Sequence, residues 1–338
     1  MKKLFVIIFL TAILISFNSC ASEISKTPVI TKTAFAMDTV CTIKIYDKNT
    51  DEKIINDSFT YVHDLENLLS RYVSTSDIAK INENAGKTYV KVDKRTLELL
   101  KECVYYSAQT DGAFDITLGS LIDLWDIESG REYIPSKSEI ENARKYIGYK
   151  NILIDEQNCS VKLAKKGVII DLGAVAKGYI SKMTKEYLIG KGIKSAIIDF
   201  GGNIVLIGKN YKGDNFAVGI QKPFNDRGEY FAAVQSDKCS MVSSGNYERY
   251  FTGTDGVVYH HIIDPKTGYP AQNGLAQVTI ICDNATVADI LSTGIYVMGE
   301  SKGYDHIEKI ENIGVIFVMS DNNIIMTENI KNSVNIIK

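Results

Sequence analysis

Apolar residues recur at every third or fourth position in several stretches of the chain, which is the spacing of one helix face. Thr96 stands where a capping residue would precede one such stretch, and Ser138 with Glu141 has the capping-box spacing at another. We therefore predict helices over 52–70, 97–109, 139–147, 173–192, 284–299 and 302–311, and a short helix within 70–82.

Other stretches alternate apolar and polar residues, or are rich in β-branched residues, which predicts strands. These strands occupy 34–46, 151–154, 160–164, 167–171, 195–199, 203–207, 215–221, 230–235, 239–243, 257–263 and 276–282, with three more after residue 311. Because they come in runs separated by single helices, we predict an α+β fold of mostly antiparallel sheets with flanking helices. Residues 34–338 form one unit, with room for two lobes.

The N-terminus has the pattern of an export signal. Lys2 and Lys3 precede an apolar run over 4–17, and Cys20 follows shortly after. We predict a signal peptide over 1–19 and a lipidated tether over 20–33. Lipid at Cys20 would anchor the exported protein on the extracytoplasmic face of the cell membrane. Phe17 stands where such signals usually have Leu, so an ordinary secreted protein and an uncleaved anchor stay open.

Composition and short motifs exclude several classes of function but do not identify one. The net charge is −3 and no basic run indicates nucleic-acid binding. Neither G-x-G-x-x-G nor G-x-x-x-x-G-K-[ST] occurs, which argues against a Rossmann site and a P-loop. The cysteines beyond Cys20 are scattered and lack C-x-x-C, so they do not form a disulfide framework.

The stretch YHHIIDPKTGYP (259–270) contains two of the four histidines. Neighbouring residues of a strand point to opposite faces, which argues against a zinc site built from His260, His261 and Asp264. Two packed histidines and one catalytic histidine both remain open. Strand alternation would place His261 and Ile263 on one face and leave His260 as a structural residue.

The stretch VIIDLGAVAKGY (168–179) ends a predicted strand at Asp171 and opens a helix at a glycine. Helix N-termini attract anions, and Lys177 two turns into the predicted helix can contact a phosphate. A simple strand-to-helix corner capped by Asp171 fits equally well.

Asp289 and Thr293 stand four residues apart in the predicted helix over 284–299 and therefore share one face. Their flanks are apolar, so we expect the pair to be buried. A buried carboxylate is costly unless it is paired or metal-bound, and carboxylate with hydroxyl or carbonyl oxygens suits Mg²⁺. A polar pair that caps a neighbouring strand is the alternative.

Together, these stretches resemble the FAD:protein FMN transferase family, the ApbE-type flavin transferases. The resemblance runs over about residues 34–328. Its segments, in order, are AFAMDTV, LLSRYVSTSDIAKIN, DGAFDITLG, DLGAVAKGY, IDFGGNI, VSSGNYERYF, HHIIDPKTGYP and ADILSTGIYVMG.

The resemblance implies a flavin transferase domain over 34–338 that uses FAD as substrate and Mg²⁺ as cofactor. A Thr or Ser hydroxyl of a target flavoprotein attacks the FMN-side phosphorus, FMN becomes attached by a phosphoester bond, and AMP leaves. The implied targets are subunits of membrane ion-pumping redox complexes. An FAD-binding or FAD-hydrolysing lipoprotein that modifies no protein is the alternative.

By position, the resemblance implies His261 as the catalytic base. Asp289, Thr293 and the backbone carbonyl of Ala174 are the implied Mg²⁺ ligands. Tyr72 matches a position whose residue type bears on transfer against hydrolysis. The implied FAD contacts are Met37, Tyr72, Ala113, Phe114, Asp115, Asp171, Lys177 and Ile263. Gly294 stands where Ala is more usual, and we expect it to loosen the helix after Thr293.

Overall fold

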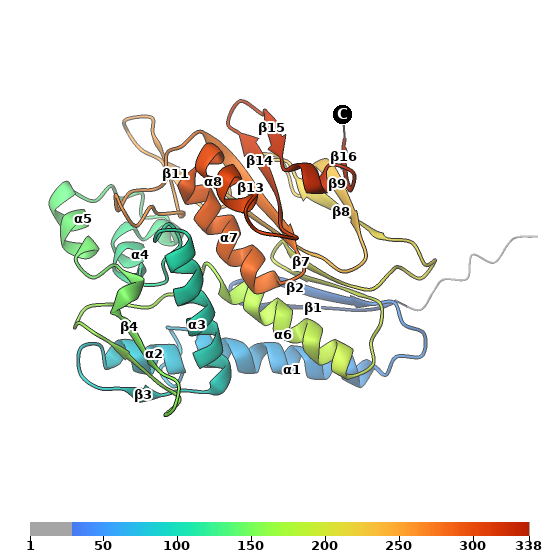
Figure 1. Ribbon diagram of the computed structural model, residues 1–338, viewed down its shortest axis with the longest axis horizontal. Coiled ribbons are helices and arrows are strands. Elements are labelled where there is room, and N and C mark those ends of the chain that lie inside the picture. Colours follow the sequence, from blue (N-terminus) through green and yellow to red (C-terminus); the bar gives the residue numbers. More distant parts are fainter. Residues whose placement is uncertain (1–28, 338) are drawn as a thin grey trace, which may run out of the picture.

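An eight-stranded antiparallel sheet forms the centre of the protein in a computed structural model, which describes residues 29–337 (Figure 1). Its strand order is β1-β2-β6-β7-β10-β13-β14-β15. Every neighbouring pair runs antiparallel. The strands are β1 (Ile30–Ala36), β2 (Thr39–Ile45), β6 (Ala196–Phe200), β7 (Asn203–Ile207), β10 (Ser240–Gly245), β13 (Leu275–Cys282), β14 (Gly314–Met319) and β15 (Ile324–Met326).

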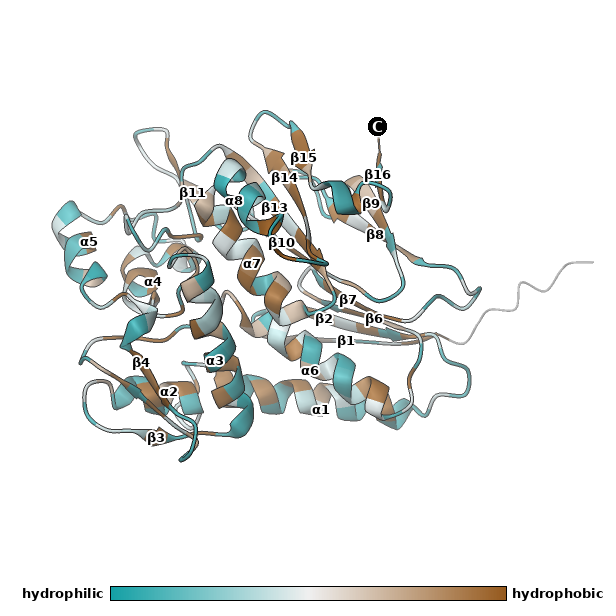
Figure 2. Ribbon diagram, viewed as in Figure 1, coloured by the Kyte–Doolittle hydropathy of each residue, from teal (hydrophilic) through white to brown (hydrophobic). Residues whose placement is uncertain are grey.

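The two faces of this sheet are covered by different elements. One face packs against the helices α1 (Glu52–Leu69), α6 (Ala176–Gly190), α7 (Ala285–Met298) and α8 (Glu300–Ile307). The other face packs against a three-stranded sheet of β16 (Val334–Ile336), β9 (Tyr230–Ser236) and β8 (Phe216–Gln221). Because β13 and β14 are buried from both sides, most of their residues are apolar (Figure 2), with Gln277 and Thr279 of β13 as buried polar exceptions.

A smaller region comes from the chain between α1 and α6 and lies beside the large sheet (Figure 1). It contains α2 (Asp77–Glu83), α3 (Lys94–Gln109), α4 (Gly119–Trp125), α5 (Lys137–Arg144), β3 (Val90–Lys91), β4 (Ile152–Asp155) and β5 (Ser160–Leu163). The ribbon of β11 (Tyr250–Thr252) and β12 (Val258–His260) joins it through an apolar cluster around Trp125, Phe251 and Ile263. Short 3-10 turns are η1 (Ile127–Ser129), η2 (Tyr149–Asn151) and η3 (Glu328–Ile330).

The predicted α+β class is confirmed, but the single strand predicted over 34–46 is wrong. Two strands pair there through a two-residue turn of Met37 and Asp38, whose φ angles are 52° and 54°. Hairpin turns of this kind usually contain Gly next to Asn or Asp, so Asp38 without a glycine is only a weak turn signal. The carboxylate of Glu66 compensates, because its Oε1 accepts the Met37 N–H at 2.7 Å.

Two predicted helix starts are also wrong. Asp93 caps α3, whereas Thr96 is buried and donates its hydroxyl to Asp77. The capping box of α5 is formed by Ser136 and Glu139 instead of Ser138 and Glu141. In both places several residues able to cap a helix stand close together, and the sequence pattern alone does not choose between them.

The predicted strand over 167–171 is absent from the described structure, apart from one isolated bridge between Leu118 and Ile169. The side chain of Asn82 takes the place of a partner strand. Its Nδ2 donates to the carbonyl of Ile170 at 2.9 Å, and its Oδ1 accepts the Ile170 N–H at 2.8 Å. The backbone of Ile170 is thereby satisfied, while the Asp171 N–H donates to the carbonyl of Ile116 and the Ile169 carbonyl accepts from the Gly119 N–H.

The predicted signal peptide over 1–19, and Cys20, lie outside the described residues. The tether predicted over 20–33 is only partly described, and the first strand already begins at Ile30. No helix within residues 29–337 is both long enough and apolar enough to cross a membrane.

Helices α6 and α7 cross in close contact at Gly178. A Cβ at this position would lie 2.3 Å from the carbonyl oxygen of Ala285 and 2.5 Å from the Cβ of Asp289. The first of these contacts is to backbone, which cannot swing aside as a flexible side chain would. The absence of a side chain at Gly178 therefore sets the distance between the two helices.

We expect Gly178→Ala to lower the free energy of unfolding by about 1–3 kcal/mol or more, because the added methyl group must push α7 away. Urea denaturation measures the effect. Gly190→Ala is the matched control in the same helix, since a Cβ there meets no atom within 4 Å. Equal stability of the two variants would show that the crossing is not tight.

Candidate active site

Asp289 of α7 is a buried carboxylate without a cationic partner. Its side chain is 4% exposed and makes no ion pair with any residue from 29 to 337. Burial raises its pKa, while the nearby charge of Lys177, the Gly178 N–H and the Asn203 amide lower it. Its Oδ2 accepts the Gly178 N–H at 2.7 Å, whereas the buried Nδ2 of Asn203 has no bond of normal geometry.

The loop before α6 presents a free backbone carbonyl. In a continuous helix the Gly178 N–H would donate to the carbonyl of Ala174, but here it donates to Asp289. No donor among residues 29–337 reaches the Ala174 carbonyl. The predicted helix start at 173 is wrong, because α6 begins at Ala176.

Asp171 does not cap α6, contrary to one of the two interpretations of its sequence. Its Oδ1 accepts the Gly173 N–H at 2.7 Å, which forms a turn before the helix. Val175 occupies the N-cap position and makes no side-chain bond. Lys177 consequently lies in the first turn of the helix instead of two turns inside it.

Thr293 is half-buried on α7 next to a small group of hydroxyls. Its Oγ1 lies 3.3 Å from the Oγ of Ser244 on β10, which in turn lies 2.8 Å from the Oγ of Ser292. The helix continues through Gly294 to Met298, so the expected loosening after Thr293 is wrong. Gly294 is instead closely packed: its Cβ would lie 3.2 Å from atoms of Thr110 and Phe114.

These oxygens fit a hard cation. A buried carboxylate without a counterion, a carbonyl without a donor and a hydroxyl on the same helix face are the ligand types that Mg²⁺ takes. Among residues 29–337 no group of three or more His, Cys, Asp or Glu side chains could hold a metal ion. That finding does not test the set of Asp289, Thr293 and Ala174, because only one member is an acidic side chain.

His261 is held by its neighbour strand through two contacts to one carbonyl. Its backbone N–H donates to the carbonyl of Arg249 at 3.1 Å, and its Nδ1 lies 3.3 Å from the same oxygen. Since a carbonyl only accepts, Nδ1 carries the proton and Nε2 keeps a free lone pair. His261 is half-buried by its exposed area. Desolvation of its ring, with the charges of His260, Arg249 and Lys177, lowers its pKa to about 3.

His260 has the structural role that the alternation predicted for it. It is 1% exposed, its Nε2 lies 2.9 Å from the carbonyl oxygen of Ala271, and its ring packs edge-on against Tyr296. The strand ends at His260, however, so the predicted strand over 257–263 is too long. Ile263 lies beyond it, in the apolar cluster around Trp125.

The positive charge of Lys177 lowers the pKa of both Asp289 and His261. It makes no ion pair within residues 29–337. The charge of this lysine in the first turn of α6 therefore acts on both the carboxylate and the histidine.

A buried arginine that the sequence analysis did not single out connects two loops of this region. The Arg71 side chain is 8% exposed, and its Nε lies 2.7 Å from Asp171 Oδ2 as an ion pair without hydrogen-bond alignment. Its Nη2 donates to Asp123 at 2.5 Å and to the Tyr72 hydroxyl at 2.8 Å. The guanidinium also stacks 4.8 Å from the ring centre of Tyr72, which is 75% exposed.

The segment 113–115 is predicted to contact FAD, and its side chains are turned inward. Ala113 and Phe114 are buried. Asp115 is buried and accepts from the Thr117 N–H, the Thr117 hydroxyl and the Tyr149 N–H at 2.8, 2.6 and 2.7 Å. These bonds fix the loop and occupy the side chain of Asp115. Contact of this segment with FAD therefore stays a prediction, and it would have to use backbone atoms.

Several residues that shape the site lacked a clear sequence signal. Glu66 sets the Met37 turn, Arg71 holds Asp171, Ser244 reaches Thr293, and Arg249 holds His261. All four stand within or directly before segments that carry the family resemblance, which was the only available pointer to them.

Comparisons with known proteins identify the family of the chain. The sequence model of the ApbE family matches residues 37–317. The FAD:protein FMN transferase of Klebsiella pneumoniae is 32% identical over 303 residues, with 90% of this chain and 93% of that protein covered. The enzyme of that name from Treponema pallidum is 30% identical over 329 residues, with 92% and 90% covered.

Solved structures show the same fold. The ApbE protein of Thermotoga maritima matches with a TM-score of 0.83 and 33% identity, over 90% of this chain and 99% of that one. The flavin transferase ApbE of Vibrio cholerae matches with a TM-score of 0.78 and 26% identity, over 90% and 100%. The chain therefore belongs to the ApbE family and is an FAD:protein FMN transferase.

Proposed function

We propose that the protein transfers the FMN moiety of FAD to a Thr or Ser hydroxyl of a target flavoprotein in a Mg²⁺-dependent reaction. The hydroxyl oxygen forms a phosphoester bond to the FMN-side phosphorus, the pyrophosphate P–O bond breaks, and AMP leaves. The observation that carries this proposal is the buried carboxylate of Asp289, which makes no ion pair within residues 29–337 and takes the Gly178 N–H away from the Ala174 carbonyl.

His261 is suited to accept the proton of the attacking hydroxyl. Its Nε2 is free because Nδ1 faces the Arg249 carbonyl, and its low pKa keeps the imidazole neutral. A pyrophosphate beside Lys177 would offset the positive charge that helps to lower this pKa. The pKa would then rise, while desolvation, the largest cause, keeps it below the ordinary value of a histidine.

The other half of the site handles phosphate charge. Mg²⁺ held by Asp289, Thr293 and the Ala174 carbonyl would neutralise negative charge on the pyrophosphate. Lys177 can bind a phosphate oxygen directly, and the first turn of α6 adds the positive end of a helix dipole. Positioning and charge stabilisation of this kind are most of what phosphoryl-type transfer requires.

We further propose that the targets are subunits of membrane redox complexes, and that lipid at Cys20 holds the enzyme outside the cell membrane. The signal-like pattern of residues 1–19 supports this placement. The mass of the mature N-terminal residue tests the lipid anchor, because an unmodified Cys20 would exclude it.

We expect His261→Ala to reduce FMN transfer by about 10²-fold or more while FAD still binds, because only the proton acceptor is lost. The measurement is a fluorescent covalent adduct on a Thr-bearing soluble domain of a redox-complex flavoprotein, with the same domain carrying Ala as control. Near wild-type transfer by the variant would remove His261 from the role of base. FMN and AMP release by the wild type without adduct would favour FAD hydrolysis.

We expect the imidazole of His261 to stay neutral between pH 7.5 and about 5 in the enzyme without FAD, because burial lowers its pKa to about 3. An unfolded histidine titrates near 6.5, so the unfolded chain binds the extra proton first. Stability contributed by this residue therefore falls as the pH drops below about 6.5. NMR of histidine ring signals tests this, and a His261 midpoint near 6.5 would contradict it.

We expect Asp289→Ala to raise the Mg²⁺ concentration for half-maximal transfer about tenfold or more, because one charged ligand is lost. Mg²⁺ titration of transfer, and of the fluorescence of bound FAD, measures this. Asp283→Ala is the matched control, since this exposed carboxylate lies just before the same helix. Unchanged Mg²⁺ titration in Asp289→Ala would show that the ligand assignment is wrong.

A further inference from the structure

The ribbon of β11 and β12 has a strand edge that no other segment within residues 29–337 covers. β11 pairs only with β12. The His261 N–H donates to the carbonyl of Arg249, and the Gly253 N–H donates to the carbonyl of Val257. In an antiparallel pair every second residue bonds to the partner strand, so these two bonds show which residues of β11 face β12 and which face away. The backbone N–H and C=O groups of Tyr250 and Thr252 therefore point away from β12, and no described residue bonds them.

The opposite edge of the ribbon is closed. The Nε2 of Gln272 donates to the carbonyl of Val258 at 2.8 Å. Next to it, the Ala271 N–H donates to the carbonyl of Ile262 at 2.9 Å. The ribbon can therefore accept another strand only along β11.

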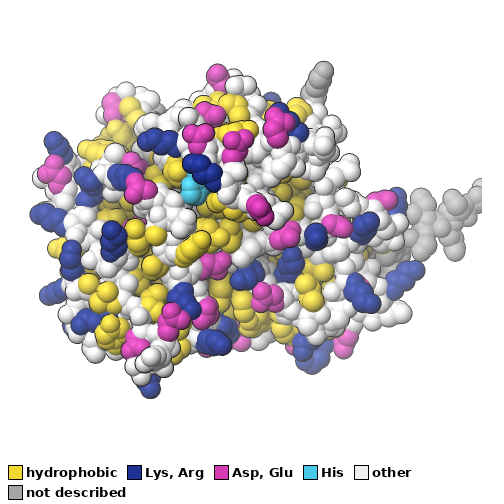
Figure 3. All heavy atoms as spheres, viewed as in Figure 1, with side chains coloured by type: hydrophobic (Ala, Val, Ile, Leu, Met, Phe, Trp, Pro, Cys, Tyr) yellow, Lys and Arg dark blue, Asp and Glu magenta, His cyan; other side chains and the backbone are white. Residues whose placement is uncertain are grey.

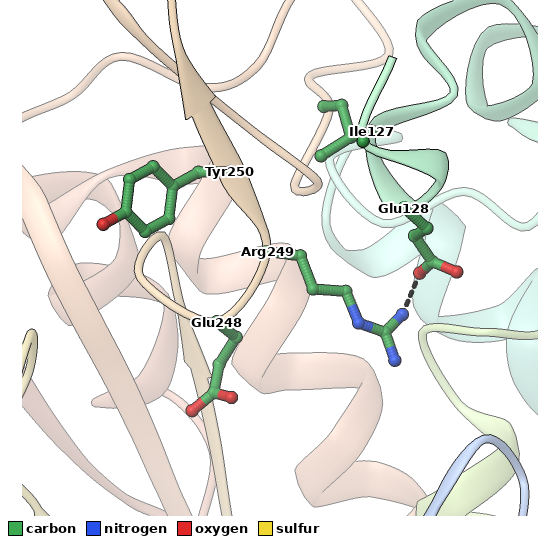
Figure 4. Close-up of a pocket in the computed structure, with 6 residues that line it drawn as sticks. Ile127, Glu128, Glu248, Arg249 and Tyr250 are labelled. Atoms are coloured by element: carbon green, nitrogen blue, oxygen red, sulfur yellow. Dashed lines mark hydrogen bonds and ion pairs between the residues drawn. The ribbon is translucent and has the colours of Figure 1, made fainter. Parts of the chain in front are cut away.

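This free edge begins directly beside the catalytic histidine. The carbonyl of Arg249, which holds His261 through its N–H and Nδ1, belongs to the residue just before β11. A pocket opens at the same place, lined by Ile127, Glu128, Gly130, Glu248, Arg249 and Tyr250 (Figure 4). An ion pair of Arg249 with Glu128 fastens its two sides together.

Exposed aromatic rings flank the edge. Tyr250 is 46% exposed and Phe224 is 58% exposed, with their ring centres 6.2 Å apart. Phe224 has a φ of 60°, which a bulky residue rarely adopts. Acidic and basic side chains are interspersed over the face in Figure 3. Main-chain bonds and aromatic contacts are therefore available for binding at this edge, next to the charged side chains of Glu128, Glu248 and Arg249 that line the pocket.

We propose that the free edge of β11, which we call the acceptor edge (Tyr250–Thr252), binds an extended segment of the target flavoprotein by strand addition. The inference rests on the proposed function, which requires a protein hydroxyl at His261. An added strand bonds to the outward N–H and C=O groups of Tyr250 and Thr252 and lies about 4.8 Å from β11. Its alternate side chains can then reach the aromatic rings, and the segment that continues past Arg249 brings the hydroxyl to His261.

Thr252→Pro tests the acceptor edge, because it removes an outward N–H and no bond to β12. With a Thr-bearing soluble domain of a redox-complex flavoprotein as substrate, we expect KM for that domain to rise about tenfold or more. The Kd for FAD should change less than about twofold, which shows that the variant is folded. Thr252→Val is the matched control, since it keeps the N–H, and its KM should stay near wild type.

An unchanged KM in folded Thr252→Pro would overturn the acceptor edge, even though transfer itself continues. A change only in self-association of the enzyme would overturn it as well, in favour of a second copy at this edge. If the proline variant does not fold, or if the wild type forms no adduct, amide hydrogen exchange of the wild-type enzyme tests whether the domain binds at the acceptor edge. Protection of the Tyr250 and Thr252 N–H groups by the added domain supports the proposal, and unchanged exchange contradicts it.

Discussion

The close contact of α6 and α7 at Gly178 is the constraint on which the site depends. It lets one backbone N–H leave the helical pattern and donate to the carboxylate of Asp289. That single bond has two effects: it partly compensates a buried carboxylate, and it frees the carbonyl of Ala174. A side chain at Gly178 would separate the helices and remove both. The buried carboxylate of Asp289 and the free carbonyl of Ala174, both proposed to bind a cation, therefore depend on the same helix crossing.

Around this crossing, a second set of contacts holds the loops that face it. Arg71 pairs with Asp171, and Asp171 fixes the turn at Gly173 that leads to Ala174. A buried guanidinium with two carboxylates is expensive to take apart, because breaking one pair leaves charge without compensation. The exposed ring of Tyr72 stacks on the same guanidinium. The orientation of the loop before α6 is therefore coupled to a residue at the rim of the site.

Sequence patterns found the parts of this structure that repeat. Helical spacing located α1, α6 and α7, and placed Asp289 and Thr293 on one buried face. Patterns failed where a side chain replaced a regular backbone partner. Asn82 satisfies the backbone of Ile170 in place of a strand, and Glu66 supports a hairpin turn that lacks Asn or Gly. Both partners are distant in the chain, and local sequence does not encode such contacts.

His261 likewise shows what sequence patterns could and could not predict about the site. Strand alternation correctly separated His260 from His261, although the strand ends at His260 and alternation does not extend to Ile263. What fixes the tautomer of His261 is the carbonyl of Arg249, and any residue type has a carbonyl. In the proposed mechanism, the phosphate-handling half of the site is thus built from packed helices, and the proposed base directly follows a two-stranded ribbon. A rigid half suits a dense, invariant charge such as pyrophosphate, whereas a ribbon with an open edge suits a protein substrate that must arrive and leave.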